Sequence, residues 1–180
     1  MGRPKALVEL DGTPLVRRAL SVLAGGGCAP LIVVVGALAE EVTAVVGDDA
    51  LVVTAADWAS GMGASLRAGL AELDARPDVS AAIVHLVDLP GVGSEAIARL
   101  AATSAGPSTL ARAFYQGKPG HPVLLGRAHW AGVQAGATGD EGARGYLSGH
   151  PDLVKVECGD LADPRDVDTP GALEAFGVVG

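Results

Sequence analysis

Asp88 is a candidate metal ligand because it directly follows the apolar segment 81–87 and precedes Leu89 and Pro90. A carboxylate at the end of a buried strand, with proline fixing the backbone just beyond it, can hold a divalent cation beside a phosphate. A turn aspartate without any ligand would give the same local pattern. This segment by itself leaves both interpretations open.

A second pair of carboxylates, Asp166 and Asp168, occupies alternate positions near the end of the chain. Alternate residues of an extended segment point to the same side, and Thr169 with Pro170 can begin a final helix. Mg²⁺ often takes only one or two protein carboxylates and fills its other positions with water and phosphate oxygens. Asp88 with one residue of this pair would therefore be sufficient, although solvation and helix capping explain the segment equally well.

Two cations, Arg3 and Lys5, lie on a short loop of glycine and proline at the start of the sequence. They could clamp a triphosphate, or they could belong to an exposed terminus. The segment Gly61–Ser65 consists of small residues leading into a predicted helix. Because helix N-termini favour anions, its amides and Ser65 could meet a ribose or a phosphate, whereas close helix packing is the alternative.

Two more residues could face a ligand. His121 precedes a proline in an extended segment, and Arg144 follows acidic residues at a predicted helix start. A structural role is the simpler explanation for His121, while Arg144 can pair with an acid or a phosphate. We expect His85, inside an apolar strand, to be a packed core residue. The sequence contains no Ser/His/Asp arrangement, Walker A loop or GxGxxG motif.

The composition limits the class of protein. The chain has 180 residues, of which 49% are hydrophobic, and a net charge of -8. We expect one domain, and the excess of acids argues against nonspecific nucleic-acid binding. The longest apolar run, Leu31–Val35, is far shorter than the ~20 residues of a membrane span. Cys28 and Cys158 have no metal-site spacing. A cytoplasmic monomer that binds neither nucleic acid nor membranes is therefore expected.

The elements that must position these residues alternate along the chain. Strands are predicted at 31–36 and 81–87, with shorter candidates at 51–54, 110–115, 121–125 and 153–157. Helices are predicted from a Thr13 cap to glycines 25–27, from 62 to 75 and from 94 to 103. This alternation predicts an α/β fold with a mostly parallel sheet. Ligands are expected beyond the carboxyl ends of the strands, after Val35, Thr54 and Val87.

Taken together and in order, these segments resemble the MobA-like nucleotidyltransferase family, and within it the molybdenum cofactor cytidylyltransferase branch. The resemblance spans nearly the whole chain and is carried by the segments 1–7, 10–15, 57–70, 87–90, 120–124, 139–144 and 166–170. It implies a Rossmann-like, three-layer αβα fold. It also implies Mg²⁺-dependent transfer of a nucleotidyl group from CTP or GTP to the phosphate of molybdopterin, with release of pyrophosphate.

The resemblance also implies roles for individual residues. Arg3 and Lys5 would neutralise the triphosphate, Asp88 would hold the metal and touch the nucleotide, and Asp168 would be a second metal contact. The nucleotide would further lie against Gly2, Gly61, Met62 and Ser65, while His121 and Arg144 would face the acceptor. The acceptor is already a phosphate, so no protein nucleophile is required and the protein mainly positions groups and offsets charge.

The sequence departs from the family pattern in two places. Family members carry a buried strand and a glycine-rich loop, of the form Leu-Ala-Ala-Gly-x-Ser-x-Arg, ahead of the Met-Gly pair at which this sequence opens. Without them, two neighbouring strands would have unpaired backbone groups and the phosphates would lose backbone amides. A chain that lacks them is expected to be marginally stable and weakly active. Leu89 replaces a frequent glutamine, which we expect to alter base or acceptor contacts only.

Three functional hypotheses follow. The first is a nucleotidyltransferase that makes a dinucleotide form of the molybdenum cofactor. The second is a transferase of the same fold that uses another phosphorylated acceptor, such as a sugar phosphate or phospholactate. The third is a non-catalytic protein that holds a cofactor or docks on a molybdoenzyme. Metal-dependent release of pyrophosphate distinguishes the enzymes from the binding protein.

Overall fold

The protein is described here by a computed structural model, which covers residues 4–167 and Phe176. Its strands are β1 Glu9–Leu10, β2 Thr13–Pro14, β3 Ile32–Val35, β4 Leu51–Thr54, β5 Ala81–Val84, β6 Leu110–Tyr115, β7 Lys118–Gly126 and β8 Leu153–Glu157. Its α-helices are α1 Leu15–Gly25, α2 Ala39–Val46, α3 Met62–Asp74, α4 Ser94–Ala101, α5 Arg127–Gly136 and α6 Arg144–Leu147. Four short 3-10 helices are η1 Lys5–Leu7, η2 Gly47–Asp49, η3 Trp58–Ser60 and η4 Gly139–Glu141.

The predicted α/β class is confirmed, but the strand directions are mixed rather than mostly parallel. β3 and β4 form a parallel pair, and the larger sheet has the order β5-β7-β6-β8. β7 runs antiparallel to both of its neighbours, whereas β6 and β8 are parallel. The reason is a tight turn between β6 and β7, where Gln116 and Gly117 have φ of 53° and 78°. Two consecutive residues with positive φ favour a hairpin.

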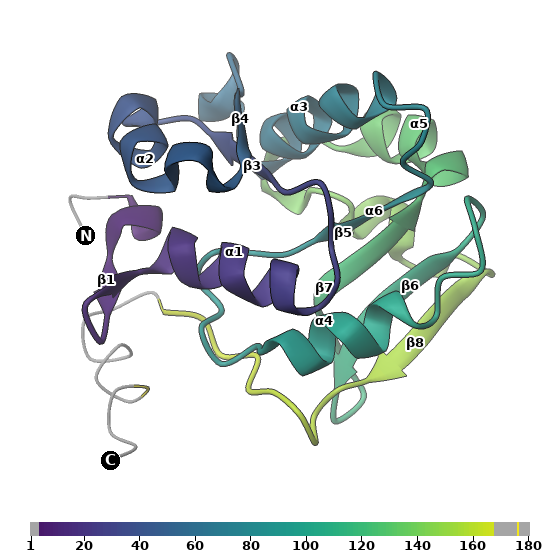
Figure 1. Ribbon diagram of the computed structural model, residues 1–180. Coiled ribbons are helices and arrows are strands. Elements are labelled where there is room, and N and C mark those ends of the chain that lie inside the picture. Colours follow the sequence, from purple (N-terminus) through teal and green to yellow (C-terminus); the bar gives the residue numbers. More distant parts are fainter. Residues whose placement is uncertain (1–3, 168–175, 177–180) are drawn as a thin grey trace.

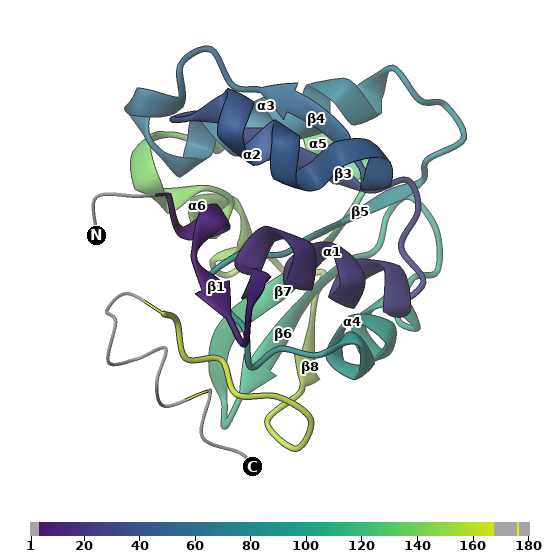
Figure 2. The same ribbon diagram turned by 60° about the vertical axis from the view of Figure 1, so that its left-hand side comes forward.

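Helices cover both faces of the strands, as expected for a three-layer αβα fold (Figure 1). α1 packs against α2 and α4 in one layer, and α3 packs against α5 in the other. Figure 2 shows α1 and α4 side by side in front of the larger sheet. Among the described residues, no helix is long and apolar enough to cross a membrane.

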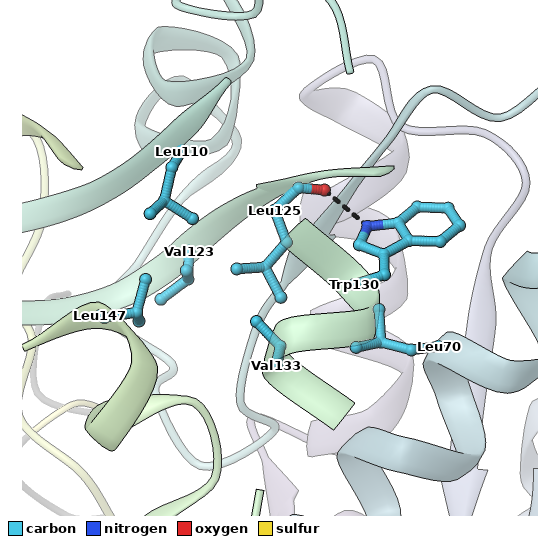
Figure 3. Close-up of a cluster of buried hydrophobic side chains, with 7 residues drawn as sticks. All are labelled: Leu70, Leu110, Val123, Leu125, Trp130, Val133 and Leu147. Carbon is cyan, nitrogen blue, oxygen red and sulfur yellow. Dashed lines mark hydrogen bonds between the residues drawn. The ribbon is translucent and has the colours of Figure 1, made fainter. Parts of the chain in front are cut away.

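The largest apolar cluster lies between the larger sheet and the layer of α3 and α5. Its buried side chains come from α3, β6, β7, α5 and α6. They are shown in Figure 3: Leu70, Leu110, Val123, Leu125, Trp130, Val133 and Leu147. The indole N–H of Trp130 donates to the Leu125 carbonyl oxygen at 2.8 Å. This bond satisfies the one polar group that burial of the tryptophan takes out of water.

The first helix begins differently from the prediction. Thr13 does not cap it: Thr13 and Pro14 form β2, which pairs with β1 across the Asp11-Gly12 turn. Asp11 and Gly12 both have positive φ, 52° and 72°, as a two-residue hairpin requires. Thr13 therefore takes part in the hairpin and does not act as a helix cap, and α1 starts at Leu15.

β3 and β5 each have one edge without a strand partner among the described residues. Both strands line one cavity of about 560 Å³, to which β3 contributes Ile32–Val34 and the β5 segment contributes residues 81–87. α1 and α3 close the cavity from the two helical layers. The strand edges of β3 and β5 that no described strand pairs thus belong to two strands that line the same cavity.

Candidate functional site

Lys5 and Asp88 form an ion pair at the carboxyl end of the β5 segment. Lys5 Nζ lies 2.8 Å from Asp88 Oδ2, and the Asp88 side chain is 18% exposed. Lys5 begins η1, so the first described turn of the chain places a cation directly beside this carboxylate. Two residues that were predicted to act together, one on a phosphate and one on a metal, are thus in contact.

The second predicted metal segment also reaches Asp88. The backbone N–H of Val167, which is buried, donates to the Asp88 carbonyl oxygen at 3.0 Å. Asp166 therefore lies in a stretch of backbone that runs beside Asp88. Asp168, like Gly2 and Arg3, lies outside the described residues. Within residues 4–167, no group of three or more His, Cys, Asp or Glu side chains could hold a metal ion.

Two histidines line the cavity next to Asp88. His121, on β7, faces the Val84 carbonyl oxygen, with Nδ1 at 3.5 Å. His85 follows the end of β5 rather than lying inside a strand, and its Nδ1 is buried without a hydrogen-bond partner in the described part of the chain. The expectation that His85 is a packed core residue is therefore wrong, because β5 ends at Val84 and His85 lines the cavity.

Both imidazoles are held neutral at physiological pH. The pKa of His85 is lowered to about 4, chiefly by burial and also by His121, while Asp88 opposes the shift. Burial also lowers the pKa of His121 to about 4, with Arg112 adding to the effect, while the Val84 carbonyl and Asp88 oppose it. These two side chains therefore offer the cavity neutral donors and acceptors rather than positive charge.

Positive charge in the cavity comes from two arginines. Arg144, at the start of α6, and Arg112, on β6, both line it. Arg112 donates from Nε to the Gly120 carbonyl oxygen at 2.9 Å. Burial and then the nearby Arg144 lower the pKa of Arg112. Two guanidinium groups that repel each other create a place where an anion is stabilised.

Arg112 lines the cavity and was not predicted from the sequence. It stands in the otherwise apolar run of β6, between Ala111 and Ala113, whose side chains are fully buried. A charged residue inside an apolar strand was the available signal. Because successive residues of a strand point to opposite faces, Arg112 faces the cavity while Ala111 and Ala113 face the core. The strand can therefore include a charged residue.

The segment Gly61–Ser65 begins α3, as predicted. The Met62 backbone N–H already donates to Asp140 Oδ1 at 3.3 Å, while the side chains of Met62 and Ser65 line the cavity. Gly61 has φ of 112°, and a Cβ there would lie 2.5 Å from the Gly139 carbonyl. Glycine is therefore required where this segment meets η4.

Comparisons with known proteins agree with this geometry. Residues 1–154 match the model of the MobA-like NTP transferase domain. The chain belongs to this family. The chain is 34% identical over 179 residues to nicotine blue oxidoreductase of Paenarthrobacter nicotinovorans, an alignment that covers 94% of this chain and 86% of that protein.

Solved structures related to this MobA-like chain have the same fold. A homologue of Mycobacterium tuberculosis Rv0371c, from Mycobacterium sp. strain JC1, is 27% identical with a TM-score of 0.80, covering 98% of this chain and 87% of that one. M. tuberculosis Rv0371c in complex with manganese is 25% identical with a TM-score of 0.78, covering 96% and 90%. These similarities confirm the predicted Rossmann-like fold, and the match over residues 1–154 confirms the MobA-like NTP transferase family.

Proposed function

We propose that this MobA-like protein transfers CMP or GMP from a nucleoside triphosphate to the phosphate of molybdopterin and releases pyrophosphate. The observation that carries the proposal is the Lys5–Asp88 pair beside the cavity that Arg112 and Arg144 line. A cation and a carboxylate suit a triphosphate with its metal ion. The two guanidinium groups suit a second, phosphorylated ligand.

Asp88 fits a Mg²⁺ ion because it is a largely buried carboxylate at the ligand-binding edge, with a second acidic segment held against its backbone through Val167. Asp168 is the proposed second ligand, and one or two carboxylates are what Mg²⁺ usually takes beside phosphates. When bound, the metal would neutralise charge on the triphosphate. The manganese complex of a relative supports a divalent metal in this family.

The chain's own residues would then position and neutralise the reacting groups. A phosphate oxygen of the acceptor attacks the α-phosphorus of the nucleotide, the bond from that phosphorus to the bridging oxygen breaks, and pyrophosphate leaves with the bond's electron pair. Lys5 and Arg3 would offset the charge on the leaving pyrophosphate. Arg144 and Arg112 would hold the acceptor phosphate, and neutral His121 would hydrogen-bond the acceptor.

Other acceptors compete with molybdopterin in this proposal. A sugar phosphate or phospholactate would use the same two arginines, since each of these compounds carries a phosphate. A non-catalytic role in holding a cofactor or docking on a molybdoenzyme is the remaining alternative. A redox reaction on a compound such as nicotine blue is a second candidate function, which the 34% identity to nicotine blue oxidoreductase favours.

The test is pyrophosphate release from CTP and from GTP, with Mg²⁺ and molybdopterin, compared with release when a sugar phosphate or phospholactate replaces molybdopterin. Metal-dependent release with molybdopterin alone supports the proposal. Release only with another acceptor would show that this acceptor, and not molybdopterin, is the substrate. No release of pyrophosphate, together with turnover of nicotine blue by the protein, favours the redox function.

A further inference from the structure

Trp58 is a large aromatic side chain that the fold leaves 47% exposed. It begins η3, in the turn that follows the carboxyl end of β4. The chain then continues through α3 into β5, which belongs to the larger sheet, whereas β4 pairs with β3. Met62 at the start of α3 and His85 after β5 line the same cavity. Trp58 itself is not among the residues that line this cavity, but it lies four positions before Met62, on the loop that leads into α3.

Gly36 fixes the position of this tryptophan. A Cβ on Gly36, directly after β3, would lie 2.6 Å from both Cβ and Cγ of Trp58 and 3.0 Å from Cδ2. Such distances are shorter than any real contact, so the root of the indole lies on the Gly36 backbone and only glycine allows this. One side of the indole is thus covered by the protein.

The loop that carries Trp58 is tied down at both ends. The Ala55 N–H donates to the Val35 carbonyl oxygen at 2.9 Å, and the Gly61 N–H donates to the Trp58 carbonyl oxygen at 3.1 Å. Asp57 also accepts from Arg67 Nη2 at 2.7 Å. The backbone that carries Trp58 is therefore anchored before any ligand arrives, which lowers the entropy lost on binding.

The second tryptophan shows what an indole with a purely structural role looks like here. Trp130 is 1% exposed, bonds the Leu125 carbonyl oxygen and lies 4.4 Å from the Arg127 guanidinium. Over the described residues, no ring or cation stacks on Trp58. An open aromatic face on an anchored loop, four positions before the cavity-lining Met62, suits a planar ring as its partner.

We infer that the open face of Trp58 stacks on the nucleobase of the nucleoside triphosphate. The inference rests on the proposed function and identifies where its base is bound. The nucleobase is favoured over the acceptor because Trp58 lies three to seven positions before Gly61, Met62 and Ser65, the proposed nucleotide segment. The proposed acceptor groups, His121 and Arg144, belong instead to β7 and α6.

Stacking reads the flat face of a base and not its hydrogen-bonding edge, so it accepts both pyrimidines and purines. Trp58 would therefore contribute affinity for CTP and for GTP alike. Discrimination between the two bases would have to come from other residues that contact the edge of the base.

Tryptophan fluorescence tests this inference directly, because the chain has only two tryptophans. CTP is expected to quench the emission of the unmodified protein and not that of Trp58→Leu, whose remaining indole is buried. Inorganic triphosphate, which lacks a base, is expected to bind without quenching. Trp58→Leu should weaken CTP binding about tenfold, or ~1.4 kcal/mol, and leave triphosphate binding unchanged.

Three variants complete the experiment. Trp58→Phe, which keeps an aromatic face, should restore most of the CTP affinity. Gly36→Ala should weaken CTP binding in the same way as Trp58→Leu, because the new Cβ displaces the indole. Val154→Ser, a change at another apolar residue that is 46% exposed, is the matched control and should have no effect.

The failure of this inference differs from the failure of the proposed function. Protein that binds CTP and releases pyrophosphate, but shows neither quenching nor a loss of affinity in Trp58→Leu, overturns the stacking alone. Protein that binds neither CTP nor GTP overturns both. Emission from Trp58 that changes with protein concentration and is insensitive to nucleotide assigns this face to self-association, and also overturns the inference.

Discussion

Lys5 Nζ donates to Asp88 Oδ2 at 2.8 Å, although 83 positions separate the two residues in the sequence. The contact joins the start of the described chain to the end of the β5 segment. While no ligand is bound, each charge offsets part of the free-energy cost of burying the other. A metal ion on Asp88 and a phosphate on Lys5 would separate the pair and take over its charges. The two residues therefore need to be tested separately.

Asp88→Asn is expected to reduce pyrophosphate release by about a hundredfold or more, because a neutral amide cannot replace the charge that holds a divalent metal. The variant should still fold, since the amide has nearly the shape of the carboxylate. Steady-state rates over a range of Mg²⁺ concentrations measure the effect. Asp78→Asn, at an exposed acidic residue, is the control. A normal rate for Asp88→Asn would remove this residue from the metal site.

Lys5→Ala is expected to raise the KM for the nucleotide more than it lowers the unfolding free energy, because the side chain is partly exposed and its proposed partner is the triphosphate. Lys5→Arg should recover part of the affinity by keeping the charge. Lys118→Ala, on an exposed part of β7, is the control, because it also removes one positive charge. An unchanged nucleotide KM in Lys5→Ala would argue against a triphosphate clamp.

His85 and His121 make stability depend on pH. The pKa of each imidazole is about 4 in the folded protein and near 6.5 when unfolded. The unfolded chain therefore binds more protons between these values, so stability falls as the pH decreases from about 6.5 to 4. The loss is of the order of 3 kcal/mol per imidazole once the pH is below both values.

Urea unfolding at several pH values checks this dependence. The double variant His85→Phe with His121→Asn should lose less unfolding free energy than the unmodified protein as the pH falls from about 6.5 to 4. Carboxylates titrate in the same range but are common to both proteins, so the difference between them isolates the two histidines. Parallel pH curves for the two proteins would show that these imidazoles are not held neutral by the fold.

Much of this fold could be predicted from runs of apolar and β-branched residues. The predicted strands at 51–54, 110–115 and 153–157 coincide with β4, β6 and β8. The antiparallel direction of β7 was not predicted, because it is decided by the two-residue turn at Gln116 and Gly117. The prediction followed the alternation of strands and helices found elsewhere in the chain and overlooked this local turn.

The site was predicted in part for a similar reason. Asp88 stood out because it breaks an apolar run at a strand end, and Lys5 because it lies on a loop. Arg112 was missed because it is embedded in β6, where only the pairing of β6 with β7 and β8 shows which side faces the cavity. His85 was assigned to the core because the end of β5 at Val84 is not marked by any change in the sequence pattern.

The core beneath the larger sheet offers a stability test that is separate from the site. Leu125 is fully buried in the cluster with Trp130 and Val133. Leu125→Ala is expected to lower the unfolding free energy by about 2–5 kcal/mol, through lost burial and the cavity left behind. Val154→Ala, at an exposed position, should change it by less than about 0.5 kcal/mol. Equal midpoints in urea for the two variants would contradict this packing.

The facing edges of β3 and β5 lead to the last prediction. A chain extended ahead of Met1 by an apolar strand and a glycine-rich loop of the family's form is expected to unfold at a higher urea concentration and to release pyrophosphate faster. A strand in the cavity of about 560 Å³ would pair with both free edges, and the loop would bring backbone amides to the phosphates. Its end would lie near Lys5, where the described chain begins beside Asp88.

Hydrogen exchange distinguishes this outcome from a nonspecific gain in stability. If the added strand occupies the cavity, the amides of β3 and of β5 should both become more protected, since a strand between them bonds to each. A matched chain with proline at alternate positions of the added strand cannot form those bonds and should behave like the unextended protein. Protection that does not change in either strand would show that the cavity is not a strand position. In that case the whole cavity, including its apolar part, would be available to the ligand that we propose for Arg112 and Arg144.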